Sequence, residues 1–303
     1  DMDPAFERSL FAGMATEQQR EGPPPGFPDL PAVPGGRYTD PQFLRLEHEF
    51  LWKRSWLYAL HADELPRAGS FRMWRRTGAP IVIIRGKDDR IRAFYNTCRH
   101  RGAPLIESER GETKGFFCRY HGWTYDLDGR LIAVREKRDF PALDTSCMGL
   151  AEVRCESFGN WVFINEARDA PPLLESLGPV PSHWAHLEVA DQRHIASSSY
   201  EIACNVKILL DAFLETYHLK SIHPQTVDRF LDSRGTHIVL WPAGHSMMVT
   251  PHRRSDWRDP GAAGMPEVAG AEEIFAHQNP SYNLYPNLVT PPSSTGIPFI
   301  TFW

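Results

Sequence analysis

Two short motifs, each with one cysteine and one histidine, constrain this chain more than any other feature of its sequence. Cys98 and His100 form C-x-H, and after seventeen residues Cys118 and His121 form C-x-x-H. A glycine follows each histidine within two residues, which predicts that both motifs lie on turns. Two loops that each supply one thiolate and one imidazole can hold a binuclear metal cluster from two sides.

The mixture of cysteine and histidine within each motif favours a Rieske-type [2Fe–2S] cluster over a zinc ion. In a Rieske centre two cysteines bind one iron and two histidines bind the other. Cys₂His₂ zinc sites usually carry two cysteines on one arm and two histidines on the other. A structural zinc site is the alternative interpretation of the same four residues. Because a Rieske cluster transfers single electrons, we expect a redox function.

A second group of candidate ligands lies in the segment NVKILLDAFLETYHLKSIHP. Its pattern predicts a helix over residues 205–219. On this helix Asp211, Glu215 and His218 lie at offsets of four and three, so we expect their side chains to be neighbours. A second stripe of the same helix is apolar and consists of Leu210, Phe213, Leu214 and Tyr217.

His223 follows His218 by five residues, an offset of about 140° on a regular helix. Pro224 removes this regularity, because the residue before a proline is pushed out of the helical region. The two imidazoles are therefore predicted to converge, and two histidines with a carboxylate match a mononuclear iron site. Glu215 is placed to hydrogen-bond one ligating imidazole. The alternatives are ordinary surface or core histidines and an exposed helix glutamate.

The composition limits the classes of function. The chain has 303 residues, 42% of them hydrophobic, which is enough for a sizeable core in one large or two ordinary domains. Its net charge of −5 gives no electrostatic case for nucleic acid. No run of eighteen apolar residues and no secretory signal is present in the sequence, so we expect no membrane association.

Three cysteines lie outside the two motifs. We expect Cys147, Cys155 and Cys204 to be small buried apolar side chains rather than members of a disulfide framework. Free thiols suit a reducing compartment, which predicts a cytoplasmic protein.

The remaining pattern predicts an α+β fold. Residues 1–37 are rich in proline and glycine and form an irregular arm, with a short helix near residues 6–14. Residues 40–55 have helical spacing, with Asp40 as the N-cap. Short apolar runs then predict a small antiparallel β domain, with strands over residues 56–60, 71–74, 80–84, 91–95, 124–127 and 161–164. A linker with a short helix (169–184) and strands over 193–204, 236–250 and 282–303 follow.

The two sites together, in this order, resemble the Rieske non-haem iron oxygenases, specifically their large (α) subunit, also called aromatic-ring-hydroxylating dioxygenases. The segments that carry the resemblance are AFYNTCRHRGAPL, FFCRYHGWTYDLDGRL, NVKILLDAFLETYHLKSIHPQT and SYNLYPNLVTPP. The resemblance implies an N-terminal arm and helix that pack with the catalytic domain (1–45), a Rieske domain (46–168) and a helix-grip catalytic domain (169–303).

The resemblance also assigns roles to the candidate residues. It implies that Cys98 and Cys118 bind one cluster iron, and His100 and His121 the other. It implies that His218 and His223 bind a mononuclear Fe(II). By the same resemblance Glu215 links His121 of one subunit to His218 of its neighbour in electron transfer, and Asp211 is a polar residue beside the iron.

The implied activity is hydroxylation, by mono- or dioxygenation or demethylation, of a small organic substrate that is aromatic or a small amine. O₂ is the oxidant, and electrons come from NAD(P)H through a reductase, with or without a ferredoxin. The implied assembly is a homotrimer, to which a β subunit can be added.

Three departures from the family pattern matter. Arg119 stands where proline is usual, and Val206 where tryptophan is common, but neither position is a ligand. The iron-binding carboxylate of the family normally follows the NLYPN stretch at some distance, and it has no matching position. We therefore expect the catalytic domain to be incomplete at its C-terminus. Asp211, Asp228 and Asp232 are conceivable substitutes, and a Rieske electron-transfer protein or an inactive oxygenase homologue is the alternative function.

Overall fold

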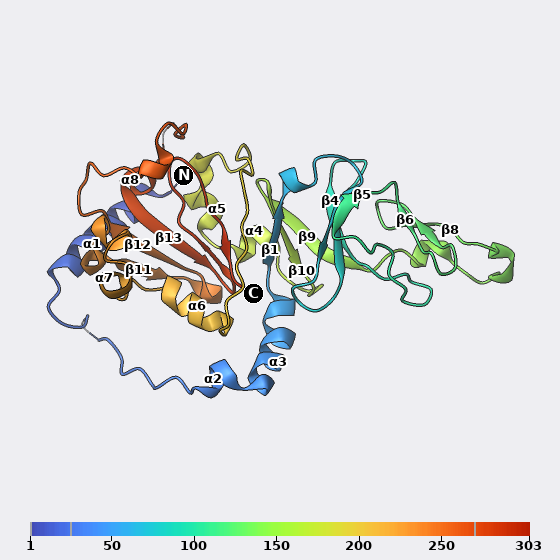
Figure 1. Cartoon of the computed structure of the whole chain (residues 1–303), viewed down its shortest axis with the longest axis horizontal. Helices are drawn as coiled ribbons and strands as arrows, with labels where there is room; N and C mark the ends of the chain where they lie inside the picture. The colour runs from blue at the N-terminus through green and yellow to red at the C-terminus, as the bar shows by residue number, and fades with distance from the viewer. Residues whose placement is uncertain (1, 25, 270) are drawn as a thin grey trace. The chain divides into compact units, whose positions relative to one another are not determined.

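The computed structural model describes residues 2–24, 26–269 and 271–303, so that Asp1, Pro25 and Gly270 lie outside the description. The chain forms two compact units (Figure 1). The β-rich unit consists of residues 48–173 and 193–196, and the mixed unit of residues 1–47, 174–192 and 197–303. The strands of the β-rich unit pair in antiparallel sheets, whereas helices accompany the sheet of the mixed unit, so the predicted α+β class is confirmed.

The β-rich unit is built on a seven-stranded antiparallel sheet. Its strands, in spatial order, are β1 (Leu57–His61), β10 (Trp161–Asn165), β9 (Glu152–Phe158), β4 (Ile91–Tyr95), β3 (Ile81–Arg85), β2 (Ser70–Trp74) and β5 (Arg110–Glu112). The predicted strands in this region are confirmed within one or two residues. Two strands of this sheet were not predicted. The three residues of β5 are all exposed and therefore give no apolar signal. The seven residues of β9 alternate poorly, since only Val153 and Phe158 are buried.

The same unit contains a second, three-stranded sheet. It consists of β6 (Phe116–Phe117), β7 (Thr124–Tyr125) and β8 (Leu131–Ala133). One apolar core joins the two sheets, and it includes both Cys98 and Cys118 among its buried members. The loops that carry the two cysteine–histidine motifs are therefore anchored in the core rather than suspended from the surface.

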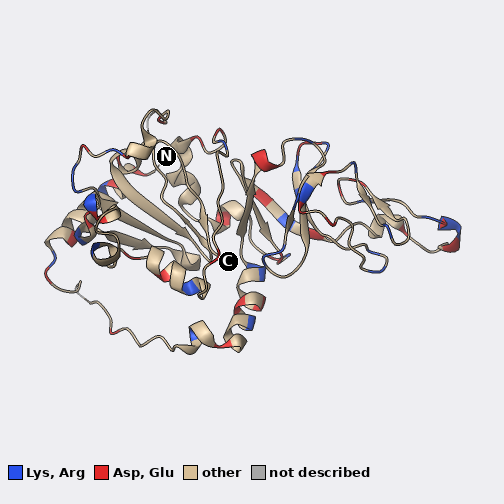
Figure 2. Ribbon diagram, viewed as in Figure 1, with Lys and Arg blue, Asp and Glu red and all other residues tan. Residues whose placement is uncertain are grey.

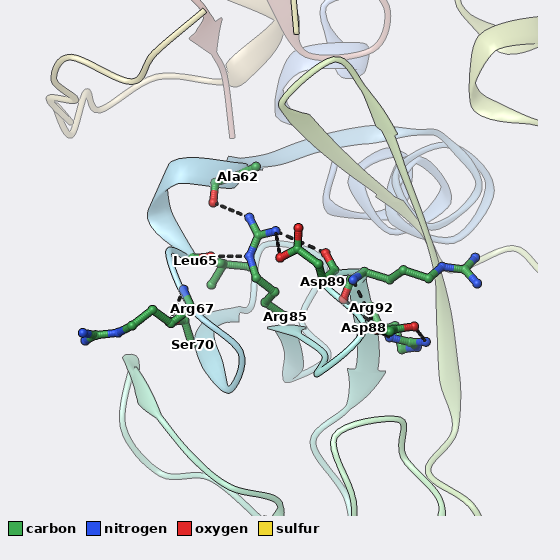
Figure 3. A network of polar contacts seen from close by, with 9 residues as sticks. Ala62, Leu65, Arg67, Ser70, Arg85, Asp88, Asp89 and Arg92 are labelled. Atoms are coloured by element: carbon green, nitrogen blue, oxygen red, sulfur yellow. Dashed lines mark hydrogen bonds and ion pairs between the residues drawn. The ribbon is translucent and has the colours of Figure 1, made fainter. Parts of the chain in front are cut away.

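Arg85, at the end of β3, ties several turns of the β-rich unit together (Figure 3). Its Nε donates to the carbonyl of Leu65 and its Nη2 to that of Ala62, at N–O distances of 2.5 and 3.0 Å. Its Nη1 donates to the carboxylate of Asp89 at 2.8 Å. The rigid fork of the guanidinium can satisfy two carbonyls and one carboxylate at once, which the point charge of a lysine could not do.

The mixed unit contains a five-stranded antiparallel meander. Its strands follow one another in sequence: β11 (His237–Leu240), β12 (Ser246–Pro251), β13 (Gln278–Leu284), β14 (Leu288–Thr290) and β15 (Ile300–Thr301). The helices of the chain are α1 (Pro4–Gln19), α2 (Gly36–Thr39), α3 (Pro41–Phe50), α4 (Leu173–Ser176), α5 (Val180–His183), α6 (Val206–Phe213), α7 (Leu219–Ile222) and α8 (Glu273–His277). None of the helices in the described part combines the length and the hydrophobicity that a membrane span requires.

Three predictions of secondary structure were wrong. The helix expected over 205–219 ends at Phe213, and Tyr217 of its predicted apolar stripe is 93% exposed. The strand expected over 193–204 is irregular and mostly exposed, because no neighbouring strand pairs with it in the described ranges. The helix expected over 40–55 stops at Phe50, although Asp40 does cap it by accepting from the Gln42 N–H at 2.7 Å.

The N-terminal arm contains more structure than its composition indicated. The short helix predicted near residues 6–14 extends over all of α1, which packs against β11 and β12.

The prediction for the three remaining cysteines was also partly wrong. Cys147 and Cys204 are exposed, and only Cys155 is partly buried. Burial raises the pKa of the Cys155 thiol to about 12, so this thiol is not reactive at neutral pH.

Gly69 provides a test of the packing between β2 and β5. It has a positive φ of 87°, and a Cβ at this position would lie 2.1 Å from the carbonyl oxygen of Thr113. Gly69→Ala should therefore lower the free energy of unfolding by about 2–4 kcal/mol through combined strain and steric overlap. Gly78 is the matched control, because its φ of 88° is the same but open space surrounds its Cβ position. Urea denaturation should show a loss of about 1 kcal/mol for Gly78→Ala, and equal losses for both variants would contradict this packing.

Candidate metal centres

The two loops that carry the cysteine–histidine motifs have the same backbone hydrogen bonds. The N–H groups of Cys98 and Cys118 each donate to the carbonyl five residues later, both at 2.8 Å. Gly102 and Gly122, four residues after the cysteines, donate back to the cysteine carbonyls at 2.9 and 2.8 Å, with φ values of 72° and 73°. The predicted turns are confirmed, and the loops are closely alike although the histidine occupies a different position in each.

These loops bring the four candidate cluster ligands together. The Cys98 and Cys118 side chains are buried in the same apolar core. The imidazole rings of His100 and His121 have centroids 4.7 Å apart, and Trp123 stacks on His100 at 4.9 Å. The Nδ1 atoms of both imidazoles are buried and lack a hydrogen-bond partner among the described residues.

Two buried imidazole nitrogens without partners are the observation that tests the fit of a cluster. Buried polar atoms are nearly always hydrogen-bonded, and an exception calls for an unseen ion or ligand. Metal coordination through both Nδ1 atoms would remove this cost. The pKa of His100 is lowered, first by burial and then by the positive charges of His121 and Arg101, and this favours the neutral imidazole that a metal requires. The donors therefore fit a [2Fe–2S] cluster.

Tyr125 is a member of this site that sequence analysis missed. Its hydroxyl lies 3.3 Å from the Cys98 sulfur and accepts the Arg99 N–H at 3.0 Å. Since the hydroxyl oxygen already accepts from Arg99, its hydrogen is free to point at the sulfur. Burial and the neighbouring Cys98 raise the pKa of Tyr125 above its ordinary value, so the hydroxyl remains protonated. A tyrosine in an apolar β segment carries no sequence signal for this role.

The second centre lies where the predicted helix breaks. Between α6 and α7, the Glu215 carboxylate contacts His218 Nδ1 and accepts the His218 backbone N–H at 3.1 Å. His218 is the N-cap of α7 and His223 its C-cap, immediately before Pro224. The two rings have centroids 5.4 Å apart. Glu215 thus fixes the orientation of His218 and leaves the Nε2 atom of that ring available for a metal.

Asp211 is held by the N-terminal arm instead of by its predicted neighbours. Its Oδ2 accepts from the hydroxyl of Tyr38 at 2.9 Å, and the Tyr38 carbonyl accepts from the side-chain amide of Asn205 at 2.9 Å. Lys207, one turn before Asp211, forms a 2.9 Å ion pair with Glu47. Residues of α2 and α3 therefore hold the start of α6, a connection that no local pattern in the sequence indicates.

The other two carboxylates considered as iron ligands also have different partners. Asp228 pairs with Arg253 at 2.9 Å, and Asp232 accepts from the side chain of Gln18 at 3.0 Å. Within the described ranges, no three His, Cys, Asp or Glu side chains converge as they would on one ion. A binuclear cluster does not require such convergence, because each of its irons takes only two protein ligands.

Comparisons with known proteins agree with both units. Residues 55–147 match the model of the Rieske [2Fe–2S] domain, and residues 189–294 match the catalytic domain of the ring-hydroxylating alpha subunit. The chain is 34% identical to the biphenyl 2,3-dioxygenase alpha subunit of Rhodococcus jostii, over 60% of this chain and 41% of that protein. It is 31% identical to the carnitine monooxygenase oxygenase subunit of Escherichia coli, over 68% and 56%.

A solved structure is similar as well. A quaternary ammonium Rieske monooxygenase superposes with a TM-score of 0.71 at 25% identity, covering 89% of this chain and 70% of that one. The chain belongs to the alpha subunits of the Rieske oxygenases. It spans about half the length of the curated relatives it matches, from 41% to 56% in these two examples.

The hydroxyl of Tyr125 gives a testable property of the cluster. A hydrogen bond to a ligating sulfur stabilises the reduced state, which carries more negative charge. If the bond contributes about 1 kcal/mol, its loss in Tyr125→Phe should lower the reduction potential by about 40 mV for a one-electron couple. The potential is measured by a dye-mediated redox titration of the visible spectrum.

Tyr120→Phe is the control for this measurement. Tyr120 packs on His121 with ring centroids 3.9 Å apart, but its ring is exposed. The potential of Tyr120→Phe should remain within about 10 mV of the parent protein, since no sulfur hydrogen bond is removed. An unchanged potential in Tyr125→Phe would show that its hydroxyl does not act on the cluster.

Proposed function

We propose that this chain is the oxygenase component of a Rieske system, which takes electrons from a reductase and uses O₂ to hydroxylate a small organic substrate. The observation that carries the proposal is the presence of two different metal-type donor sets in one chain. One set has two thiols and two unpartnered imidazoles. The other has a histidine pair whose first member is oriented by a carboxylate. An electron carrier needs only the first set.

In this proposal each side chain has a definite task. Cys98, Cys118, His100 and His121 would hold the [2Fe–2S] cluster, and His218 and His223 two positions of a mononuclear iron. The iron, when bound, would supply the oxygen chemistry. The Glu215 carboxylate accepts a hydrogen bond from His218 Nδ1. The Nε2 atom on the other side of the same ring would then face the metal. Tyr125 donates a hydrogen bond toward the Cys98 sulfur.

Electron transfer between neighbouring subunits, with Glu215 as the link between His218 and the partner subunit's His121, is part of the same proposal. Support comes from the surface around the second motif loop. Tyr120, which packs on His121, and Phe117 and Ile132, on strands β6 and β8 of the three-stranded sheet, are each more than half exposed. Exposed aromatic and aliphatic side chains of this kind are typical of a lasting protein contact. A homotrimer would cover them, and a β subunit is a possible addition to it.

The substrate class follows from the relatives. Their names indicate biphenyl and chlorobenzene as aromatic substrates, and carnitine and glycine betaine as quaternary ammonium substrates. We propose that this protein acts on a small organic molecule from one of these two classes. A panel with one compound of each kind distinguishes them by substrate-dependent O₂ uptake.

A Rieske electron-transfer protein, which would need only the first donor set, is the alternative to the oxygenase. The iron content of the purified protein decides between the two functions. An oxygenase holds three irons and two labile sulfides per chain, whereas an electron carrier holds two of each. Two irons, with no substrate-dependent O₂ uptake, would overturn the oxygenase proposal.

Glu215→Gln tests the proposed electron path. The amide cannot hold the negative charge beside His218, so electron transfer to the iron should slow by about 10- to 100-fold. Iron content and the dithionite-reduced cluster spectrum should stay unchanged. Rapid mixing of the reduced protein with O₂ and substrate measures the rate of cluster re-oxidation.

Glu201→Gln is the matched control, because Glu201 is an exposed acid in an irregular segment. It should re-oxidise at the parent rate. If Glu215→Gln also re-oxidises at the parent rate, Glu215 has no part in the path.

A further inference from the structure

Charge is divided unevenly between the two units of this chain. The residues of the β-rich unit include 22 Lys and Arg and 17 Asp and Glu, which gives a net charge of +5 (Figure 2). The residues of the mixed unit include 11 Lys and Arg and 21 Asp and Glu, which gives −10. The modest net charge of the whole chain conceals a basic unit, and a basic unit attracts acidic partners over distances of the order of 10 Å at moderate salt.

A cleft in the β-rich unit concentrates this positive charge. Strands β4 and β9 pair at Ala93–Val153 and Phe94–Glu152, and the Tyr95 N–H extends this pairing to the Ala151 carbonyl at 2.9 Å. A cleft of about 530 Å³ lies beside these strands, lined by residues 149–154 together with Arg99 and Arg168. Three arginines and one acidic residue, Glu152, are therefore among the residues that line it.

Two of these three arginines are available to a ligand. Arg154 is fixed internally, because it pairs with Glu156 at 2.6 Å and lies over the Trp56 ring at 5.2 Å. Arg99 and Arg168 are exposed, and neither forms an ion pair in the described part of the chain. Guanidinium groups without a carboxylate partner are well suited to bidentate recognition of carboxylates on another protein.

The cleft also leads to the proposed cluster. Arg99 stands between the candidate ligands Cys98 and His100 in sequence. Its backbone N–H donates to the Tyr125 hydroxyl at 3.0 Å, and that hydroxyl lies 3.3 Å from the Cys98 sulfur. A protein that binds the Arg99 side chain is therefore close to the cysteine-ligated iron of the cluster. Electron transfer requires such closeness, whereas binding of a substrate does not.

We propose that this arginine cleft is the docking site for an acidic one-electron donor protein, and this inference rests on the proposed function. In each encounter the donor loses one electron and the [2Fe–2S] cluster gains it, and no bond is formed or broken. The polar character of the cleft favours a transient donor over a second copy of this chain. Electron-transfer contacts are small and are steered by charge, whereas the apolar surface around Phe117 and Tyr120 suits a lasting contact between copies.

The test uses a plant-type [2Fe–2S] ferredoxin as the acidic donor, because its potential lies below that of Rieske clusters. Anaerobic rapid mixing with the reduced ferredoxin measures the rate of cluster reduction. The double variant Arg99→Gln/Arg168→Gln should be reduced about fivefold or more slowly at low salt, with a weaker dependence on ionic strength. Reduction by a photogenerated neutral deazaflavin radical should remain at the parent rate in both proteins.

Arg119→Gln is the matched control. Arg119 follows Cys118 directly, just as Arg99 follows Cys98, and its side chain is 83% exposed outside the cleft. This variant should keep the parent rate with ferredoxin. Equal rates for the parent, the control and the double variant would overturn the proposal. So would a slower rate in the double variant that accompanies a changed oligomeric state in sedimentation, because the cleft would then be a contact between copies.

Binding of the oxidised ferredoxin, measured by calorimetry at low salt, separates this inference from the proposed function. It requires no electron transfer and should weaken in the double variant alone. A parent protein without the visible spectrum of a cluster contradicts the proposed function itself. Unchanged ferredoxin binding in the double variant contradicts the docking site, whatever the cluster content.

Discussion

Two buried imidazole nitrogens without hydrogen-bond partners are the constraint around which the β-rich unit is organised. An apolar core that includes Cys98 and Cys118 surrounds the site, and Trp123 covers one face of His100. Leaving two such nitrogens unsatisfied costs free energy, and coordination of the proposed cluster would remove this cost. The matching backbone hydrogen bonds of the two loops hold the candidate donors in place.

The mixed unit prepares its histidines differently. The break between α6 and α7 allows the Glu215 carboxylate to accept the backbone N–H of His218, the N-cap of α7, and to orient the ring of the same residue. The start of α6 is held from another part of the chain, where Tyr38 binds Asp211 and Glu47 binds Lys207. The position of the proposed iron ligands therefore depends on α2 and α3, which are distant from them in the sequence.

The two surfaces near the cluster differ in chemistry, and this difference has a physical meaning. Phe117 and Tyr120, in and beside the Cys118–His121 loop, are exposed to water. A stable protein contact that removes their apolar surface from water would be favourable. Unpaired arginines near Arg99 gain from a partner that arrives and leaves, because long-range attraction raises the rate of encounter without a large buried area. A protein that receives electrons from one partner and passes them on within an assembly benefits from both kinds of surface.

The candidate donors, the turns that carry them and most of the antiparallel strands with buried apolar residues could be predicted from the sequence, because spacing and alternation are local properties. The sequence also predicted that His223 lies at a helix end before Pro224. It could not show that Tyr125 reaches the Cys98 sulfur, that Tyr38 holds Asp211, or that the predicted helix divides after Phe213. The first two features are contacts between residues that are distant in the sequence. The third depends on tertiary packing, which can end a helix where its intrinsic propensity would continue it. None of the three leaves a periodic signal in the chain.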